Sequence, residues 1–106
     1  MHWPGNYFNT REKSARLVEN MLSLKQNGKA KSIGLSNFKA GDLELLDNNI
    51  KNFSLNQIPY SLLDRGYEGK TLDLCKKNSV EYMAFSPTAQ GLLARPMKEN
   101  DLKLPT

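Results

Sequence analysis

The sequence contains few of the residues on which several classes of site and structure depend. Only one of its 106 residues is a cysteine and only one is a histidine, so we expect neither an internal disulfide nor a metal site. No apolar run approaches the roughly 18 residues that span a bilayer, which predicts no membrane insertion. The first residues, Met1 to Gly5, lack the basic and apolar stretches of a signal peptide. We therefore expect a cytoplasmic protein.

Charge of one sign is also not concentrated anywhere in the chain. The net charge is +4 and the pI about 9.3, with only a loose cluster at Lys25, Lys29 and Lys31. Nucleic-acid-binding proteins usually gather such charge on one face or carry a recognisable module. We interpret this charge as a solvated basic surface, with an anionic partner as the alternative, and expect no nucleic-acid binding. Neither a P-loop nor a G-x-G-x-x-G fingerprint is present.

Hydrophobic periodicity predicts helices and strands in alternation. Asn9 or Thr10 can cap the first helix, and Asn27-Gly28 is typical of its end. A loop at 60–69 and a loosely ordered polar tail at 95–106 are also expected. The predicted elements are a helix at 10–27, a strand at 30–35, a helix at 40–48, a strand at 53–58, a helix at 70–78 and a strand at 80–85.

This order is typical of parallel β-α units with right-handed crossovers, so we predict an α/β fold in which residues 1–94 form one domain. The pattern alone does not decide between an open sheet and a barrel. Polar residues stand at each predicted strand end: Ser36-Asn37, Asn56-Gln57, and Ser86 with Thr88. Ligands of parallel α/β proteins bind at that edge of the sheet.

Four segments, each near a predicted strand end, resemble the aldo-keto reductase family, and more its bacterial and potassium-channel β-subunit branch than the animal aldose reductases. They span residues 2–93, almost the whole chain. The resemblance implies part of an eight-stranded (β/α) TIM barrel, from the end of the fourth strand to the loop after the seventh, with three strands and three helices. The segments are His2-Trp3-Pro4, Ile33-Gly34-Leu35-Ser36-Asn37-Phe38, Asn56-Gln57-Ile58-Pro59-Tyr60-Ser61-Leu62-Leu63-Asp64-Arg65 and Phe85-Ser86-Pro87-Thr88-Ala89-Gln90-Gly91-Leu92-Leu93.

The resemblance also implies a role for individual residues. His2 matches the active-site histidine, and the alternative is a frayed terminal histidine without function in this chain. Ser36, Asn37 and Gln57 match the group that hydrogen-bonds the nicotinamide carboxamide, which hydroxyl and amide side chains suit. The alternative is that Ser36 or Asn37 only caps the following helix.

Further cofactor contacts are implied after the third strand. Phe85 stands where relatives carry an aromatic residue that stacks on the nicotinamide ring, although an inward-pointing strand residue is the alternative. The loop that follows, with Ser86, Thr88, Gln90 and Gly91, resembles the one whose amides approach the pyrophosphate. Thr88 departs from the leucine usual there. Cys75 is expected in the core and Arg95 in solvent.

The implied function is reduction of a small carbonyl substrate with NADPH or NADH. Of the family's four catalytic residues only the histidine is matched, because the resemblance puts the tyrosine, lysine and aspartate in strands before His2. We therefore expect a fragment that is inactive alone. The alternatives are a non-catalytic nucleotide-binding module and a structural fragment that self-associates. Exposed edge strands favour self-association or pairing with a complementary barrel fragment.

Overall fold

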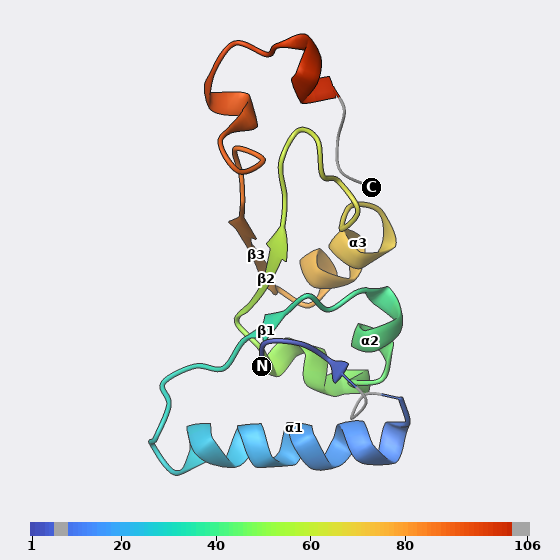
Figure 1. Cartoon of the computed structure of the whole chain (residues 1–106). Coiled ribbons are helices and arrows are strands. Elements are labelled where there is room, and N and C mark those ends of the chain that lie inside the picture. The colour runs from blue at the N-terminus through green and yellow to red at the C-terminus, as the bar shows by residue number, and fades with distance from the viewer. Residues whose placement is uncertain (6–8, 103–106) are drawn as a thin grey trace.

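Helices and short strands alternate along the chain in a computed structural model that describes residues 1–5 and 9–102 (Figure 1). Two 3₁₀ segments also follow the last strand, η3 at Leu92–Ala94 and η4 at Glu99–Leu102. The preceding elements, in chain order, are α1 at Arg11–Gln26, β1 at Leu35–Ser36, α2 at Ala40–Glu44, the 3₁₀ segment η2 at Asp47–Asn52, β2 at Leu55–Pro59, α3 at Lys70–Lys77 and β3 at Glu81–Phe85.

The three strands form one parallel sheet in the order β1-β2-β3, which confirms the predicted α/β class. Ser36 of β1 lies opposite Gln57 of β2, and Gln57 lies opposite Met83 of β3. Pro59 and Phe85 form the last pair of the ladder between β2 and β3. Because the strands are parallel, these residues bring the ends of all three strands to one edge of the sheet.

The two faces of the sheet differ in how they are covered. Asn56 and Ile58 of β2 are fully buried, on the face against which α3 and its buried Cys75 pack (Figure 1). Side chains alternate between faces along a strand, and the opposite face exposes Gln57 together with Met83, which is 48% exposed. One face therefore belongs to the core and the other is open.

The hydrophobic core lies between the sheet and the helices. Phe38 and Leu43 are fully buried at its centre, and Val18 brings one face of α1 into the same cluster. Burial of side chains this large supplies about 1.5–3 kcal/mol each relative to full exposure. The cluster thus ties the segment after β1 to the packing of the whole domain. Its other buried members are Ile33, Leu35, Leu46, Ile50, Phe53, Cys75 and Val80.

The first and third helices confirm the predicted boundaries within one residue. Thr10 is extended and its hydroxyl accepts the N–H of Lys13 at 3.2 Å, which satisfies one of the free donors at the start of α1. Gly28, just past the end, has a φ of +73°, a conformation that costs glycine nothing. The helix predicted at 70–78 is observed as α3, and the loop at 60–69 is irregular as expected.

The predicted helix at 40–48 is too long. The structure ends α2 at Glu44 and continues as the 3₁₀ segment η2, whose first residue, Asp47, has a φ of +50°. A positive φ cannot be accommodated inside a right-handed helix. Phe53, predicted as the first strand residue, instead caps η2, so that β2 begins at Leu55.

The predicted strand at 30–35 is also wrong in extent, because regular pairing is confined to Leu35 and Ser36. Pairing begins irregularly at Ile33, whose carbonyl accepts both the N–H and the hydroxyl of Ser54, at 2.9 and 3.1 Å. Within the predicted polar tail, Glu99–Leu102 form a 3₁₀ turn, and residues 103–106 lie outside the described part. Across the described residues, no helix combines the length and apolar character that a membrane span needs.

Candidate functional site

The end of β1 places two adjacent polar side chains inside the protein. Ser36 is 7% exposed and Asn37 only 4%. The Ser36 hydroxyl donates to the main-chain carbonyl of Gln57 at 2.8 Å, and the same carbonyl accepts the Asn37 N–H at 2.9 Å. Asn37 has a φ of +63°, a left-handed conformation that asparagine tolerates better than most residues. The chain therefore turns sharply out of the strand at this point.

The side-chain amide of Asn37 has one open hydrogen-bonding position. Its Nδ2 donates to the carbonyl of His2 at 3.0 Å and to the Ser36 hydroxyl at 3.1 Å, which uses both N–H bonds. Its Oδ1 is buried and has no partner among the described residues. A buried amide oxygen without a partner is costly, so this atom is suited to accept a hydrogen bond from a ligand. Ser36 donates its only proton within the protein and can offer a ligand no donor.

Gln57 and Phe85 lie on the open face of the same sheet. Gln57 is opposite Ser36 in the ladder, and its exposed amide has no hydrogen-bond partner within the described residues. Phe85 is two positions further along the strand direction, on the same face as Gln57. Because each residue adds about 3.3 Å along a strand, Gln57 and Phe85 are separated along the strands by roughly the size of an aromatic ring. An amide and a flat apolar ring thus lie on the open face, while the buried acceptor of Asn37 lies at the end of β1.

The segment at His2 is held against the end of β1. The terminal ammonium of Met1 donates to the carbonyl of Gly34 at 2.7 Å, and partial burial lowers the pKa of that ammonium. His2 contributes its carbonyl to Asn37, while its imidazole is exposed and contacts Trp3 edge-on with ring centroids 5.8 Å apart. The main chain of His2 is therefore tied to Asn37, while its imidazole is exposed. The imidazole makes no hydrogen bond with the other described site residues.

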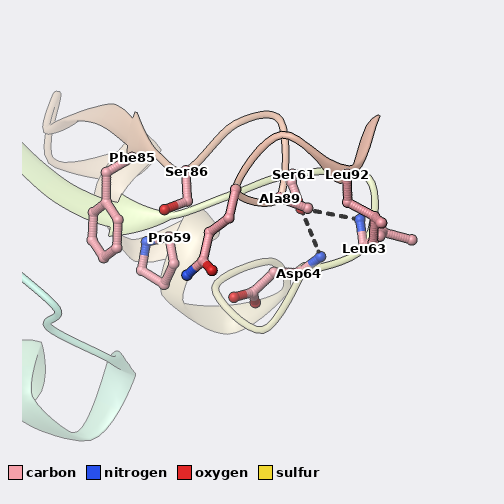
Figure 2. Close-up of a pocket in the computed structure, with 9 residues that line it drawn as sticks. Pro59, Ser61, Leu63, Asp64, Phe85, Ser86, Ala89 and Leu92 are labelled. Carbon is pink, nitrogen blue, oxygen red and sulfur yellow. Dashed lines mark hydrogen bonds between the residues drawn. The ribbon is translucent and has the colours of Figure 1, made fainter. Parts of the chain in front are cut away.

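A pocket of about 450 Å³ opens beyond Phe85 (Figure 2). It lies between the loop after β2 and the loop after β3, and its volume is within the range of small-molecule sites. Three predicted site residues, Phe85, Ser86 and Gln90, meet in this pocket, whereas Ser36, Asn37 and Gln57 do not line it. The remaining lining residues are Pro59, Ser61, Leu63, Asp64, Ala89 and Leu92.

The loop after β3 folds on itself through left-handed residues. Ser86, Ala89, Gln90 and Gly91 all have positive φ, between 51° and 90°. The N–H of Gly91 donates to the Thr88 hydroxyl at 3.2 Å, and the amides of Leu92 and Leu93 donate to main-chain carbonyls of the same loop. These three amides are therefore used internally. Thr88 and Gly91 form part of this turn and do not line the pocket.

The other wall of the pocket is fixed by a polar turn. The Ser61 hydroxyl accepts the N–H groups of Leu63 and Asp64 at 3.1 and 3.0 Å, shown as dashed lines in Figure 2. Beyond the turn, Glu68 accepts the phenol of Tyr60 at 2.5 Å and the guanidinium of Arg65 at 2.8 Å. These hydrogen bonds lower the pKa of Glu68, and the bond to Glu68 raises the pKa of Tyr60. The loop at 60–69 is thereby held in one conformation.

Sequence reasoning missed the contribution of this loop to the pocket. Pro59, Ser61 and Asp64 stand inside the segment that carries the family resemblance, so the signal was available, but no single position within it indicated a cavity. Asn56 was noted only as a polar residue at a strand end, whereas the structure buries it completely within β2.

No group of three His, Cys, Asp or Glu residues in the described part of the chain could hold a metal ion.

Comparison with known proteins places this geometry in a family. The sequence matches the Aldo/keto reductase family over residues 1–105. It is 36% identical over 88 residues to the NADH-specific methylglyoxal reductase of Escherichia coli, an alignment that covers 74% of this chain and 24% of that protein. It is 33% identical over 95 residues to oxidoreductase sirO of Leptosphaeria maculans, covering 82% of this chain and 29% of that protein. The chain thus spans about a quarter of the length of these curated relatives. The match over almost all of its residues shows that the chain belongs to the aldo/keto reductase family.

Proposed function

We propose that this chain forms the nicotinamide-binding side of an NAD(P)H-dependent aldo-keto reductase acting on small carbonyl compounds in the cytoplasm. The observation that carries the proposal is the buried, unpartnered Oδ1 of Asn37 at the end of β1. The other side-chain polar atoms of Ser36 and Asn37 are bonded within the protein. The atom without a partner, Asn37 Oδ1, is a hydrogen-bond acceptor, which is what the N–H₂ group of a primary carboxamide needs.

Gln57 and Phe85 complete a set that suits nicotinamide. The exposed amide of Gln57 can both donate to and accept from a planar carboxamide. Phe85 presents an aromatic face on the same side of the sheet, and ring stacking contributes about 0.5–1.5 kcal/mol beyond burial. Next to Phe85, the Ser86 hydroxyl and the Gln90 amide line the pocket and can contact the rest of the cofactor. These residues bind and orient the nicotinamide ring.

A bound reduced nicotinamide supplies the hydride for carbonyl reduction. This chain contributes orientation, because the Asn37 and Gln57 amides hold the carboxamide and so fix which ring face meets the substrate. Of the family's proton-transfer residues, the resemblance matches only His2 within the described part of the chain. We therefore propose that the 106 residues bind the cofactor but do not by themselves reduce a carbonyl.

Fluorescence titration of the purified chain with NADPH and with NADH tests the proposal. We expect saturable binding that weakens by about 2- to 10-fold for Gln57→Ala, the equivalent of one neutral hydrogen bond. Asn37→Gly should weaken it similarly, since glycine accepts the positive φ while removing the amide. Gln26→Ala, at the exposed end of α1, is the matched control and should bind like wild type. A folded chain with no saturable binding at millimolar cofactor would overturn the proposal.

The open face of the sheet favours a second function, self-association. Met83 is 48% exposed beside the exposed Gln57, and β3 has no strand on its outer side within the described residues. An unpaired edge strand presents open main-chain N–H and carbonyl groups with which another chain can pair. Light scattering should show a dimer or larger assembly, and Met83→Lys should shift it towards monomer. A monomer at all concentrations would exclude self-association and leave a complementary barrel fragment as the partner.

A further inference from the structure

The four residues after β1 are held at every main-chain N–H. The Asn37 N–H donates to the carbonyl of Gln57, as described above. Each of the next three donates to a side chain: Phe38 to Asn56 Oδ1 at 3.3 Å, Lys39 to Asp42 Oδ2 at 3.0 Å, and Ala40 to Thr71 Oγ1 at 3.0 Å. A loop with every donor satisfied has one strongly preferred conformation. Of the three acceptor side chains, only that of Asn56 bonds Phe38, the residue directly after Asn37.

Asn56 uses both ends of its amide on a single residue. Its Nδ2 donates to the Phe38 carbonyl at 2.9 Å, while its Oδ1 accepts the Phe38 N–H. Asn56 and Phe38 are both 0% exposed. An apolar residue at position 56 could fill the same space, but it would remove both hydrogen bonds that Asn56 makes with the buried main chain of Phe38. The amide therefore replaces ladder pairing that the sheet no longer provides beyond Asn37.

The position of this clamp matters because Asn37 is in the left-handed region. Asn37 is fixed on one side by the ladder bond to Gln57 and on the other by the clamp on Phe38. Without the second restraint, an extended or right-handed conformation at Asn37 costs less. Either change would rotate the Asn37 side chain away from Ser36 and His2. Its Oδ1 would then no longer be the atom left open.

We propose that Asn56 is the positioning residue of the site: its paired hydrogen bonds to Phe38 hold Asn37 so that Oδ1 is presented to a primary carboxamide. Asn56 does not touch the ligand in this arrangement and acts only through the main chain of Phe38. The inference rests on the proposed nicotinamide function for its ligand, but the restraint on Asn37 is a property of the chain itself and can be measured separately.

The test compares Asn56→Ala with Ser54→Ala in the full chain. Ser54 is a matched control, because its hydroxyl, just before β2, also bonds to a main-chain carbonyl next to β1, that of Ile33. For each variant, NAD⁺ and NADP⁺ affinity is corrected for the folded fraction. We expect Asn56→Ala to lose about 10-fold or more in affinity, equivalent to about 1.4 kcal/mol, while Ser54→Ala stays within about 2-fold of wild type. In ¹⁵N spectra, the Asn37 side-chain signals and the exchange of the Phe38 amide should change only in Asn56→Ala.

Asn56→Asp provides a rescue that a purely structural role would not predict. Ionised aspartate cannot donate to the Phe38 carbonyl, but protonated aspartic acid has one O–H donor and one acceptor and can restore both bonds. Burial favours the protonated acid. The titratable groups beside position 56 are the Cys75 thiol and the Tyr82 phenol, whose pKa values are both raised, so that they stay neutral throughout the test. Affinity of Asn56→Asp should recover from pH 7 to pH 5 relative to wild type and Ser54→Ala.

The outcomes separate this inference from the proposed function. If wild type binds neither cofactor, the proposed function fails; the inference then stands or falls on whether Asn56→Ala displaces the Asn37 and Phe38 signals. If wild type binds and Asn56→Ala binds equally well, Asn56 is not a positioning residue. If Asn56→Ala does not fold, the acid recovery of Asn56→Asp decides, and a folded Asn56→Asp without recovery overturns the inference.

Discussion

The hydroxyl of Thr71 accepts the main-chain N–H of Ala40 at 3.0 Å, and so joins the first turn of α3 to the first residue of α2. Thr71 is 6% exposed and shares the buried face of α3 with Cys75. Ala40 is three residues after Asn37, so this contact fixes the far end of the segment on which the candidate site depends. Two helices and one strand end are thereby coupled by a single side chain.

Thr71→Val tests this coupling, because valine keeps the shape of threonine and removes only the acceptor. The Ala40 N–H would be left partly buried without a partner, which should reduce the free energy of unfolding by about 1–2 kcal/mol. Urea denaturation measures the change. Lys70→Ala is the control, since it breaks only the exposed ion pair with Glu44 and should cost less than about 1 kcal/mol. Equal losses in the two variants would contradict the coupling.

A second prediction concerns the aromatic face at the end of β3. Phe85→Leu should weaken nicotinamide cofactor binding by about 2- to 10-fold, because it removes the ring but keeps an apolar side chain in the half-buried position. Phe85→Tyr should bind like wild type, since the ring is retained. Titration of the cofactor fluorescence gives both values. A Phe85→Leu variant with unchanged affinity would show that Phe85 only lines the pocket.

The sequence predicted those parts of the fold whose signals are local. The ends of α1 follow from Thr10 and Asn27-Gly28, and the amphipathic pattern around Cys75 predicted α3. The end of α2 was not predictable from periodicity, because Leu43, Leu46 and Ile50 continue the apolar pattern across the interruption at Asp47. All three residues are buried although α2 ends between Leu43 and Leu46, so the pattern carries no sign of the break.

The candidate site was likewise predicted only in part from the sequence. The residue types at the ends of β1 and β3 indicated a ligand edge, and the structure brings Ser36, Asn37 and Gln57 together there. The pocket beyond Phe85 depends on two loops that are more than twenty residues apart and meet only in the folded chain. The bonding state of each amide, which leaves Asn37 Oδ1 open, likewise follows from the tertiary structure.

A third prediction uses two glycines that differ in their surroundings. A Cβ at Gly34 would lie 3.3 Å from the Leu55 side chain and 3.4 Å from its carbonyl oxygen, whereas a Cβ at Gly41 would meet nothing within 4 Å. Gly34→Ala should therefore destabilise the protein by about 1–3 kcal/mol through overpacking between β1 and β2. Gly41→Ala, inside α2, should stabilise it by about 0.5–1 kcal/mol.

Thermal or urea unfolding distinguishes these two substitutions, and Leu55→Ala provides the partner for a double-mutant cycle. If the Leu55 side chain is the obstacle, part of the cost of Gly34→Ala disappears when Leu55 is already truncated. Additive effects would instead assign the cost to the main chain at Leu55. Either sign of the Gly41→Ala effect is informative, but a loss above about 1 kcal/mol would contradict the open surroundings of that glycine.

The last prediction concerns stability at alkaline pH. Burial raises the pKa of the Cys75 thiol, and burial together with nearby Cys75 raises the pKa of Tyr82, whose phenol donates to the Tyr67 carbonyl at 2.7 Å. Groups whose pKa is higher in the folded state hold their protons longer there than in the unfolded chain. Their contribution to stability is complete below the ordinary pKa values, about 8.5 for a thiol and about 10 for a phenol, and is lost as the pH rises through the folded values.

The free energy of unfolding should therefore rise slightly up to about pH 8, because the pKa of the Met1 ammonium is lowered, and fall above about pH 8.5. Cys75→Ala should reduce the slope between about pH 8.5 and 10, and Tyr82→Phe the slope above about pH 10, whatever each costs at neutral pH. Tyr60 and Tyr67, whose pKa values are also raised, should leave a residual slope in both variants. Urea unfolding at fixed ionic strength measures these slopes. In the native protein the buried thiol should also resist alkylation until unfolding exposes it, and rapid labelling at pH 8 would contradict both its burial and its raised pKa.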